Sequence, residues 1–272
     1  MFRGIYAGAS AMLVQEKMLD VVGNNLANVD TSGFKARVAV NKSFPEVLMD
    51  RVERYTIVDE MENFKLGENR FFTHQRGRAP IGSISFANVM SETTMSLAPG
   101  VVQNTSNPLD ILINGPGFFV VEDGMGNTFY TRQGHFTKSD QGEIVTHEGM
   151  TLQGDGGPIQ VGEGSSISIG DSGQVIVDNQ QVGQIRIVNF ETPTYLRHEG
   201  KSLLSETEQS GAAEDVETPA IVGGALERSN VQVVLEMVRM IEANRAYEAS
   251  AKAVTIQDEL SGRMFTSVGK PA

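Results

Sequence analysis

Cysteine is absent from the 272 residues of the chain. This absence excludes disulfide cross-links, thiolate metal sites and cysteine nucleophiles. Basic residues are in the minority, because 22 lysines and arginines stand against 34 aspartates and glutamates, and the formal net charge is −12. The basic residues are also scattered along the chain. A surface that binds the phosphate backbone of a nucleic acid is therefore not expected.

Long apolar runs are lacking as well. No stretch approaches the roughly 18 apolar residues of a membrane-spanning helix, so membrane insertion is not expected. The first residues, MFRGIYAGAS, do not combine a basic region with the uninterrupted apolar region of a secretory signal. We expect that, if the protein leaves the cytoplasm, it does so by a route that does not cleave such a signal.

The N-terminal zone is predicted to be helical. Its apolar residues recur every seven positions, which is the spacing of a coiled-coil seam. The residues in this row are Ile5, Met12, Leu19 and Leu26. The predicted helix covers residues 4–28, and Gly33 is expected to stop it after Asp30-Thr31-Ser32.

The C-terminal zone is also predicted to be helical, and it carries two apolar rows. The first row contains Val233, Met237, Met240, Asn244, Tyr247, Ala251, Val254 and Asp258. The second contains Val231, Val234, Val238 and Ile241 and, after Arg245, resumes with Ala246, Ala249, Ala253, Ile256 and Leu260. Because one short helix cannot cover both rows, the remaining surface must contact the middle of the protein or other copies of it. Ser229 or Asn230 is expected to cap the first turn.

The middle of the chain has the alternation and turn residues of short β-strands. Strands are expected at 111–113, 118–121, 128–131, 167–169 and 184–188. Glycine-containing turns are expected at 115–117, 124–127, 139–142 and 170–173. Residues 140–145 (DQGEIV) are echoed by residues 171–176 (DSGQVI), which predicts two similar hairpins.

These zones define an α+β fold in which paired N- and C-terminal helices form a coiled-coil-like stalk beside an all-β middle domain. Residues 1–33 and 226–272 would form a terminal helical assembly domain, and residues 81–225 a β-rich outer domain. Residues 34–80, with the runs Phe44-Pro45-Glu46 and Phe71-Phe72, would form a linker segment.

The residues give no support to an enzyme, and no catalytic, cofactor-binding or metal-binding residues are assigned. Gly170-Asp171-Ser172-Gly173 matches the stretch around a chymotrypsin-like nucleophile, but it is a hairpin turn whose echo has Gln141 at the serine position. The four histidines lie alone, without the paired spacing of metal ligands. The glycine-rich loops join strands and do not open a helix, as nucleotide-binding loops must.

The two terminal helices are therefore the informative feature. They could form an intramolecular hairpin packed on the β-domain, or a stalk that packs against neighbouring subunits, because the second apolar row is otherwise exposed. A secreted binding or adhesion module that forms oligomers through its termini is the alternative from another class.

The motifs at both ends resemble the bacterial flagellar rod and hook proteins. The N-terminal match consists of residues 5–12 (IYAGASAM) and 19–35 (LDVVGNNLANVDTSGFK). The C-terminal match consists of 226–231 (LERSNV) and 236–248 (EMVRMIEANRAYE). The middle is similar to the family at 107–110 (NPLD), 114–119 (NGPGFF) and 130–136 (YTRQGHF).

The resemblance implies a structural subunit of the flagellar basal-body rod, exported by the flagellar type III apparatus, whose terminal helices form the axial tube. Its partners would be other rod and hook-basal-body subunits and further copies of itself. The assembly interface is then expected to comprise Ile5, Met12, Leu19, Asn24, Asn25, Leu26, Asn28, Val234, Val238, Met240, Ile241, Arg245, Tyr247 and Val254. Residues 154–161 (GDGGPIQV) and 44–49 (FPEVLM) favour a proximal over a distal rod subunit.

Overall fold

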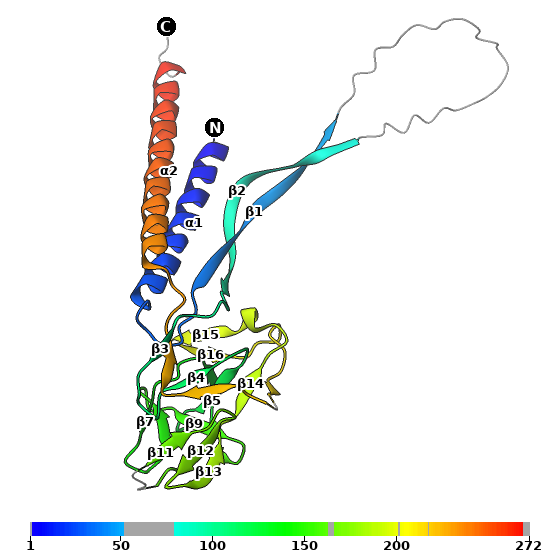
Figure 1. Cartoon of the computed structure of the whole chain (residues 1–272). Coiled ribbons are helices and arrows are strands. Elements are labelled where there is room, and N and C mark those ends of the chain that lie inside the picture. Colours follow the sequence, from blue (N-terminus) through cyan, green and yellow to red (C-terminus); the bar gives the residue numbers. More distant parts are fainter. Residues whose placement is uncertain (1, 52–78, 163–165, 201, 217, 269–272) are drawn as a thin grey trace, which may run out of the picture. The chain divides into compact units, whose positions relative to one another are not determined.

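The computed structural model describes residues 2–51, 79–162, 166–200, 202–216 and 218–268. Helix α1 (Phe2–Ala27) comes first, a β-rich middle follows, and helix α2 (Val233–Val268) closes the chain (Figure 1). This order confirms the predicted arrangement of a helix at each end and strands between them. The chain divides into two compact units. The first contains Met1–Val14, Asn41–Val89 and Ala249–Ala272, and the second contains Gln15–Val40 and Met90–Glu248.

Helix α1 ends at Ala27, one residue before the predicted end. Asn28 closes the last turn, because its side-chain Nδ2 donates to the carbonyl oxygen of Asn24 at 2.8 Å. The prediction that Gly33 stops the helix is wrong, since Gly33 lies several residues further on. Its φ of +68° favours glycine, and the absence of a Cβ atom lets the backbone pass Arg132, whose carbonyl oxygen would lie 2.2 Å from a Cβ atom at this position.

Helix α2 begins at Val233, and neither predicted cap performs that role. The Ser229 hydroxyl accepts from the N–H of Val231 at 3.3 Å, ahead of the helix. The side chain of Asn230 accepts from the N–H of Ala36 at 2.7 Å and donates to the carbonyl of Ser96 at 3.0 Å. Asn230 therefore ties the entry of α2 to distant segments of the second unit.

Within the first unit, α1 and α2 pack against each other at glycines. A Cβ atom on Gly8 would lie 2.5 Å from Cγ2 of Val254, and one on Gly4 would reach the side chain of Gln257. The later residue on α1, Gly8, faces the earlier residue on α2, Val254. The two helices therefore run antiparallel here. Strands β1 (Arg37–Arg51) and β2 (Ala79–Met95) form a two-stranded sheet. Residues 52–78, including Phe71 and Phe72 of the expected linker, lie outside the described residues.

The second unit contains the start of β1 up to Val40, the end of β2 from Met90, and the remaining strands. Its largest sheet has ten strands and follows the order β15-β16-β6-β5-β9-β8-β7; outside this order, β10 pairs with β9, β14 pairs with β5, and β17 pairs with β14. These strands are β5 (Phe118–Glu122), β6 (Thr128–Thr131), β7 (Phe136–Lys138), β8 (Ile144–Thr146), β9 (Thr151–Gly154), β10 (Gly157–Pro158), β14 (Ile187–Asn189), β15 (Arg197–Gly200), β16 (Leu203–Ser205) and β17 (Glu214–Asp215).

Smaller sheets complete the unit. One has the order β11-β12-β13, and two are pairs, β18-β4 and β19-β3. The bounds are β3 (Val102–Asn104), β4 (Ile111–Ile113), β11 (Ile167–Ile169), β12 (Gln174–Val177), β13 (Gln180–Gln184), β18 (Ile221–Gly223) and β19 (Ala225–Glu227). A short 3-10 helix covers Pro193–Tyr195.

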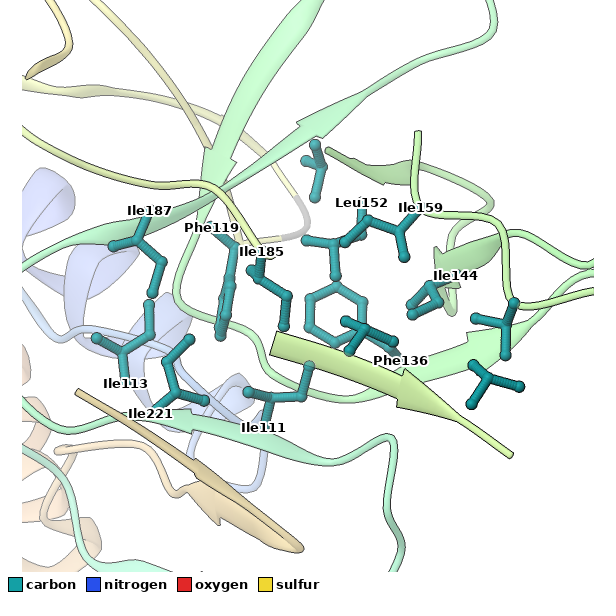
Figure 2. Packing of buried hydrophobic residues seen from close by; sticks show 14 of the residues in the cluster. Ile111, Ile113, Phe119, Phe136, Ile144, Leu152, Ile159, Ile185, Ile187 and Ile221 are labelled. Atoms are coloured by element: carbon teal, nitrogen blue, oxygen red, sulfur yellow. The ribbon is translucent and has the colours of Figure 1, made fainter. Parts of the chain in front are cut away.

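Strand β5 is buried on both faces and separates two apolar clusters. Phe119 and Val121 belong to the larger cluster, whose labelled members appear in Figure 2, and Phe118 and Val120 belong to the smaller one. Successive side chains of a strand point to opposite faces, which explains why this strand is a continuous apolar run. In the larger cluster, the rings of Phe119 and Phe136 pack edge to face, with their centroids 5.3 Å apart.

The two echoed segments form the same kind of hairpin turn, as predicted. The N–H of Gly142 donates to the carbonyl of Ser139 at 2.9 Å, and that of Gly173 donates to the carbonyl of Gly170 at 2.9 Å. Both closing glycines have positive φ. The strand predicted at 184–188 is instead interrupted after Gln184, because the chain leaves its pairing with β12 and then pairs with β5.

Candidate assembly surface on the terminal helices

In the second unit, one face of α2 carries exposed apolar side chains. Val234 is 76% exposed, Val238 45% and Ile241 53%. Their spacing of four and three residues places them on one face of the helix. They belong to the second apolar row of the sequence, for which a contact with the middle of the protein or with other copies was expected, and at these three positions the side chains are exposed.

The opposite face of α2 in this unit packs inward. Glu236 and Ala243, seven residues apart, are both buried. The Glu236 carboxylate accepts from Arg239 at 2.6 Å and from Nδ2 of Asn25 on α1 at 3.4 Å. A helix that is anchored on one face and apolar on the other presents a fixed surface to a neighbour.

The first unit has exposed apolar side chains on both helices. Ile256, Leu260 and Met264 are spaced four residues apart on α2 and are exposed. On α1, Tyr6 and Leu13 are exposed and lie seven residues apart. Tyr6 and Leu13 were not among the predicted interface residues, although their heptad spacing is the signal that could have identified them.

The predicted interface residues fall into three groups by exposure. Val234, Val238, Ile241 and Arg245 are exposed. Ile5, Met12, Leu19, Asn24, Leu26, Asn28, Met240, Tyr247 and Val254 are half-buried. Asn25 is fully buried, and its amide bonds to Arg37 and Glu236 of the same chain. The structure therefore gives Asn25 partners within the chain.

A buried charge cluster lies where the segments next to the two helices meet the β-strands of the second unit. Nζ of Lys35 lies 2.6 Å from Oε1 of Glu227, and NH1 of Arg132 lies 3.7 Å from Oε2 of the same carboxylate. Burial lowers the pKa of Lys35, and the hydrogen bond to Glu227 acts in the opposite direction. Burial likewise lowers the pKa of Arg132. The sequence offered no sign of this cluster, because its members are isolated charges in distant motifs.

The other chemistry-bearing residues form no catalytic arrangement. Ser172 is exposed on its turn, and within the described residues no hydrogen bond joins it to a histidine. Nδ1 of His135 lies 2.7 Å from Oδ1 of Asp110, which also accepts from Asn107. In the described part of the chain, no group of three or more His, Cys, Asp or Glu side chains could share a metal ion. No described helix is long and apolar enough to cross a membrane.

Three family models match the chain. Residues 5–35 match "Flagella basal body rod protein", residues 112–177 match "Flagellar hook protein FlgE/F/G D1 domain", and residues 222–266 match "Flagellar basal body rod FlgEFG protein C-terminal". The three matches correspond to most of α1 with the segment that follows it, to part of the β-rich middle, and to the segment that leads into α2 together with most of α2 itself.

Full-length relatives agree with these matches. The basal-body rod protein FlgG of Bacillus subtilis is 33% identical over 274 residues, covering 96% of this chain and 97% of the relative. FlgG of Caulobacter vibrioides is 32% identical, covering 95% of this chain and 96% of the relative. FlgF of the same organism is 31% identical, covering 99% of both chains.

The three family models, which cover parts of both terminal helices and of the β-rich middle, together with the full-length relatives, define a structural subunit of the flagellar basal body. The chain belongs to the flagellar basal-body rod protein family. Members of this family are structural and non-enzymatic. Membership places the protein in the rod of the flagellar basal body and implies contacts with other rod and hook-basal-body subunits.

Proposed function

We propose that the chain assembles into the axial tube of the rod through its two terminal helices, which pair as a coiled-coil-like stalk. The observation that carries this proposal is the exposed row Val234, Val238 and Ile241 on a helix whose other face is anchored by Glu236 and Ala243. A row of regularly spaced apolar side chains is a contact surface, whereas single exposed apolar residues are ordinary. Contact between unlike surfaces of successive copies builds an open helical array.

The same proposal covers the partners and the route to the rod. The stalk packs against further copies of the chain and against neighbouring rod subunits, and the tube transmits torque from motor to hook. Export by the flagellar type III apparatus is proposed on the family resemblance. Nucleic acid binding and membrane insertion form no part of the proposal, which agrees with a net charge of −12 and scattered basic residues.

We assign the chain to the proximal rod, the FlgF type, on the motifs at 154–161 and 44–49. The distal type, FlgG, is the second candidate, because the FlgG of Bacillus subtilis is 33% identical over 96% of this chain. The copy number separates them. Quantitative mass spectrometry of purified basal bodies should find this chain in few copies relative to the other rod subunits, whereas many copies would identify the distal type.

The assembly proposal is tested by placing a charge on the exposed face of α2. Ile241→Asp leaves the buried face of the helix intact but makes the contact surface polar, so cells carrying it should lack complete rods and should not swim. Leu19→Asp, on the heptad row of α1, should have the same effect. Met125→Asp is the matched control, because Met125 is exposed on the turn between β5 and β6.

The readouts are swimming in soft agar and electron microscopy of isolated basal bodies. Circular dichroism of each purified variant should show an intact fold. Normal motility of the Ile241→Asp strain would contradict assembly through this face. Absence of the chain from intact basal bodies would contradict the rod function itself and would direct attention to a secreted oligomeric binding module.

A further inference from the structure

A recess of about 370 Å³ opens in the second unit, away from the apolar row of α2. Its lining includes the three charged side chains of the buried cluster, Lys35, Arg132 and Glu227. Apolar side chains, among them Leu97, Val102 and Phe118, form much of the remaining wall. The volume lies within the roughly 300–1,000 Å³ typical of ligand pockets.

The charged groups of the recess do not balance. Two cations face one carboxylate, and Glu227 is already engaged. Its Oε1 accepts from Lys35 Nζ at 2.6 Å and from the N–H of Gly100 at 2.8 Å. A buried positive charge that exceeds its counter-charge is unfavourable, and one further anion would neutralise it.

Arg132 carries the unused hydrogen-bonding capacity. Its NH1 donates to the carbonyl of Ile113 at 3.3 Å and its NH2 to the carbonyl of Gly115 at 2.6 Å. The Nε atom is buried and has no hydrogen-bond partner among the described residues, and the side chain is nine-tenths buried. Because Nε is not accessible, an entering carboxylate would bond to the second N–H groups of NH1 and NH2, since a guanidinium has five N–H donors and binds a carboxylate through charge-assisted hydrogen bonds.

We propose that this recess binds a carboxylate side chain of a second copy of this chain, packed beside the first in the rod. The inference rests on the proposed function, because the rod brings copies into contact. Charge complementarity selects the occupant, since the chain carries 34 acidic side chains and a net charge of −12 and so presents carboxylates to its neighbours.

The position of the recess suits such a contact. In an open helical array, one surface of each subunit contacts a different surface of the next subunit, so each subunit carries both surfaces. The apolar row of α2 supplies one kind of contact, and the recess supplies a polar one on the β-rich part of the chain. The apolar wall formed by Leu97 and Val102 would pack against the stem of the entering side chain and exclude water from its carboxylate.

Two adjacent valines, Val101 just before β3 and Val102 as its first residue, allow a controlled test. Val102 lines the recess and is 54% exposed, whereas Val101 is 72% exposed and is not part of the lining. A genetically encoded photo-crosslinking amino acid is placed at one position or the other in cells, and basal bodies are isolated after irradiation. Mass spectrometry then identifies the crosslinked peptides and counts the chain in the same sample.

The crosslinker at Val102 should join two copies of the chain, with the second copy attached within a few residues of an aspartate or glutamate. Its yield should exceed that from Val101 at least fivefold. In a second arm, Val102→Glu should lower the amount of the chain per basal body at least twofold, because its carboxylate competes for Arg132, whereas Val101→Glu should not.

Three results would overturn the proposal. These are equal crosslinking from both positions, attachment to a different protein, and attachment to a segment without an acidic residue. In each of them the chain is still counted in basal bodies, so the proposed function stands. Absence of the chain from intact basal bodies would instead overturn the proposed function and this inference together.

Discussion

The side-chain amide of Asn25 forms a reciprocal pair of hydrogen bonds with the backbone of Arg37. Nδ2 donates to the Arg37 carbonyl at 2.9 Å, and Oδ1 accepts from the Arg37 N–H at 2.8 Å. The amide thus forms with Arg37, the first residue of β1, the two hydrogen bonds that the backbone of a neighbouring strand would otherwise form. Because Asn25 is fully buried, both bonds lie away from water and fix the end of α1 to the start of β1.

Asn25→Asp should therefore be strongly destabilising at neutral pH. The change removes the donor to the Arg37 carbonyl and buries a carboxylate near Oε2 of Glu236, which lies 3.4 Å from Nδ2. Loss of a buried hydrogen bond to a group left unsatisfied lowers the free energy of unfolding by about 1–3 kcal/mol, and the added charge increases the loss. Urea unfolding at pH 7 measures it.

The pH dependence identifies the cause. Burial and Glu236 raise the pKa of the introduced carboxyl above its unfolded value of about 3.9, so the folded state binds its proton more tightly. The destabilisation should consequently grow as pH rises through the raised pKa and shrink as pH falls below it. Asn104→Asp, at an exposed amide on β3, should change stability by less than about 0.5 kcal/mol at any pH.

Gly8→Ala should loosen the contact between α1 and α2. The added Cβ would lie 2.5 Å from Cγ2 of Val254, and a β-branched side chain has little freedom to move away. Overpacking of this kind lowers stability by about 1–3 kcal/mol, and a contact as close as this one is expected in the upper part of that range, above the roughly 1 kcal/mol that alanine gains over glycine in a helix. Amide hydrogen exchange along α1 measures the local effect.

Two further variants isolate the steric cause of that effect. Gly23→Ala is in the same helix, where an added Cβ meets nothing within 4 Å, so it should increase protection. Val254→Ala removes the opposing methyl group and should restore protection to the Gly8→Ala chain. Reduced protection in Gly23→Ala, or no rescue by Val254→Ala, would show that the close approach of the helices is not the cause.

The sequence was sufficient to locate the two helices and most short strands, because periodic apolar rows and turn glycines are local signals. Helix α1 ends within one residue of its predicted end for this reason. Asn230 shows the limit of such signals, because it looks like a helix cap but binds Ala36 and Ser96, which are far away in the chain. A local pattern cannot reveal a contact that only the tertiary fold creates.

For the candidate surface too, local sequence patterns reveal some features and miss the contacts that only the tertiary fold creates. The second apolar row through Val234 and Ile241 could be predicted to need a second partner, whereas the sequence left open whether the middle of the same chain or another copy supplies it. The cluster of Lys35, Arg132 and Glu227 could not, because Lys35 and Glu227 are 192 residues apart and each is an isolated charge in the sequence. Asn25 stood among the expected contacts of the assembly, whereas its buried amide already has partners in its own chain.

Glu227→Gln should reduce stability far more than the loss of a nearby surface ion pair. The change leaves Lys35 and Arg132 buried without their shared carboxylate, and removing one partner of a buried pair lowers stability by about 3–5 kcal/mol. Asp30→Asn breaks the pair with Arg228 at 2.9 Å, where both side chains are at least half exposed. Such surface pairs contribute about 0–1 kcal/mol.

Urea unfolding of the two variants in parallel measures the contrast. Lys35→Met in the Glu227→Gln background should recover part of the loss, because it removes one of the two uncompensated cations. A Glu227→Gln chain as stable as the Asp30→Asn chain would show that Glu227 is not needed to neutralise this cluster.

His198 should make the protein less stable in mild acid. Burial, with a smaller contribution from the charge of Arg37, lowers the pKa of His198 from 6.5 to about 4. Between these values the unfolded chain binds a proton that the folded chain does not, so the free energy of unfolding rises with pH across this window. The stability that the neutral His198 side chain contributes above pH 6.5 is lost as the pH falls to 4. At 1.36 kcal/mol per unit of pKa difference, this loss is about 3 kcal/mol.

Urea unfolding of His198→Gln between pH 4 and 7 tests this assignment. The substitution removes the titrating group, so the slope of stability against pH in this window should flatten relative to the unmodified chain. His147→Gln replaces an exposed imidazole in the same way and is the control for the substitution itself. An equal slope in His198→Gln and the unmodified chain would mean that His198 does not account for the acid sensitivity, because this imidazole is the titrating group that the substitution removes.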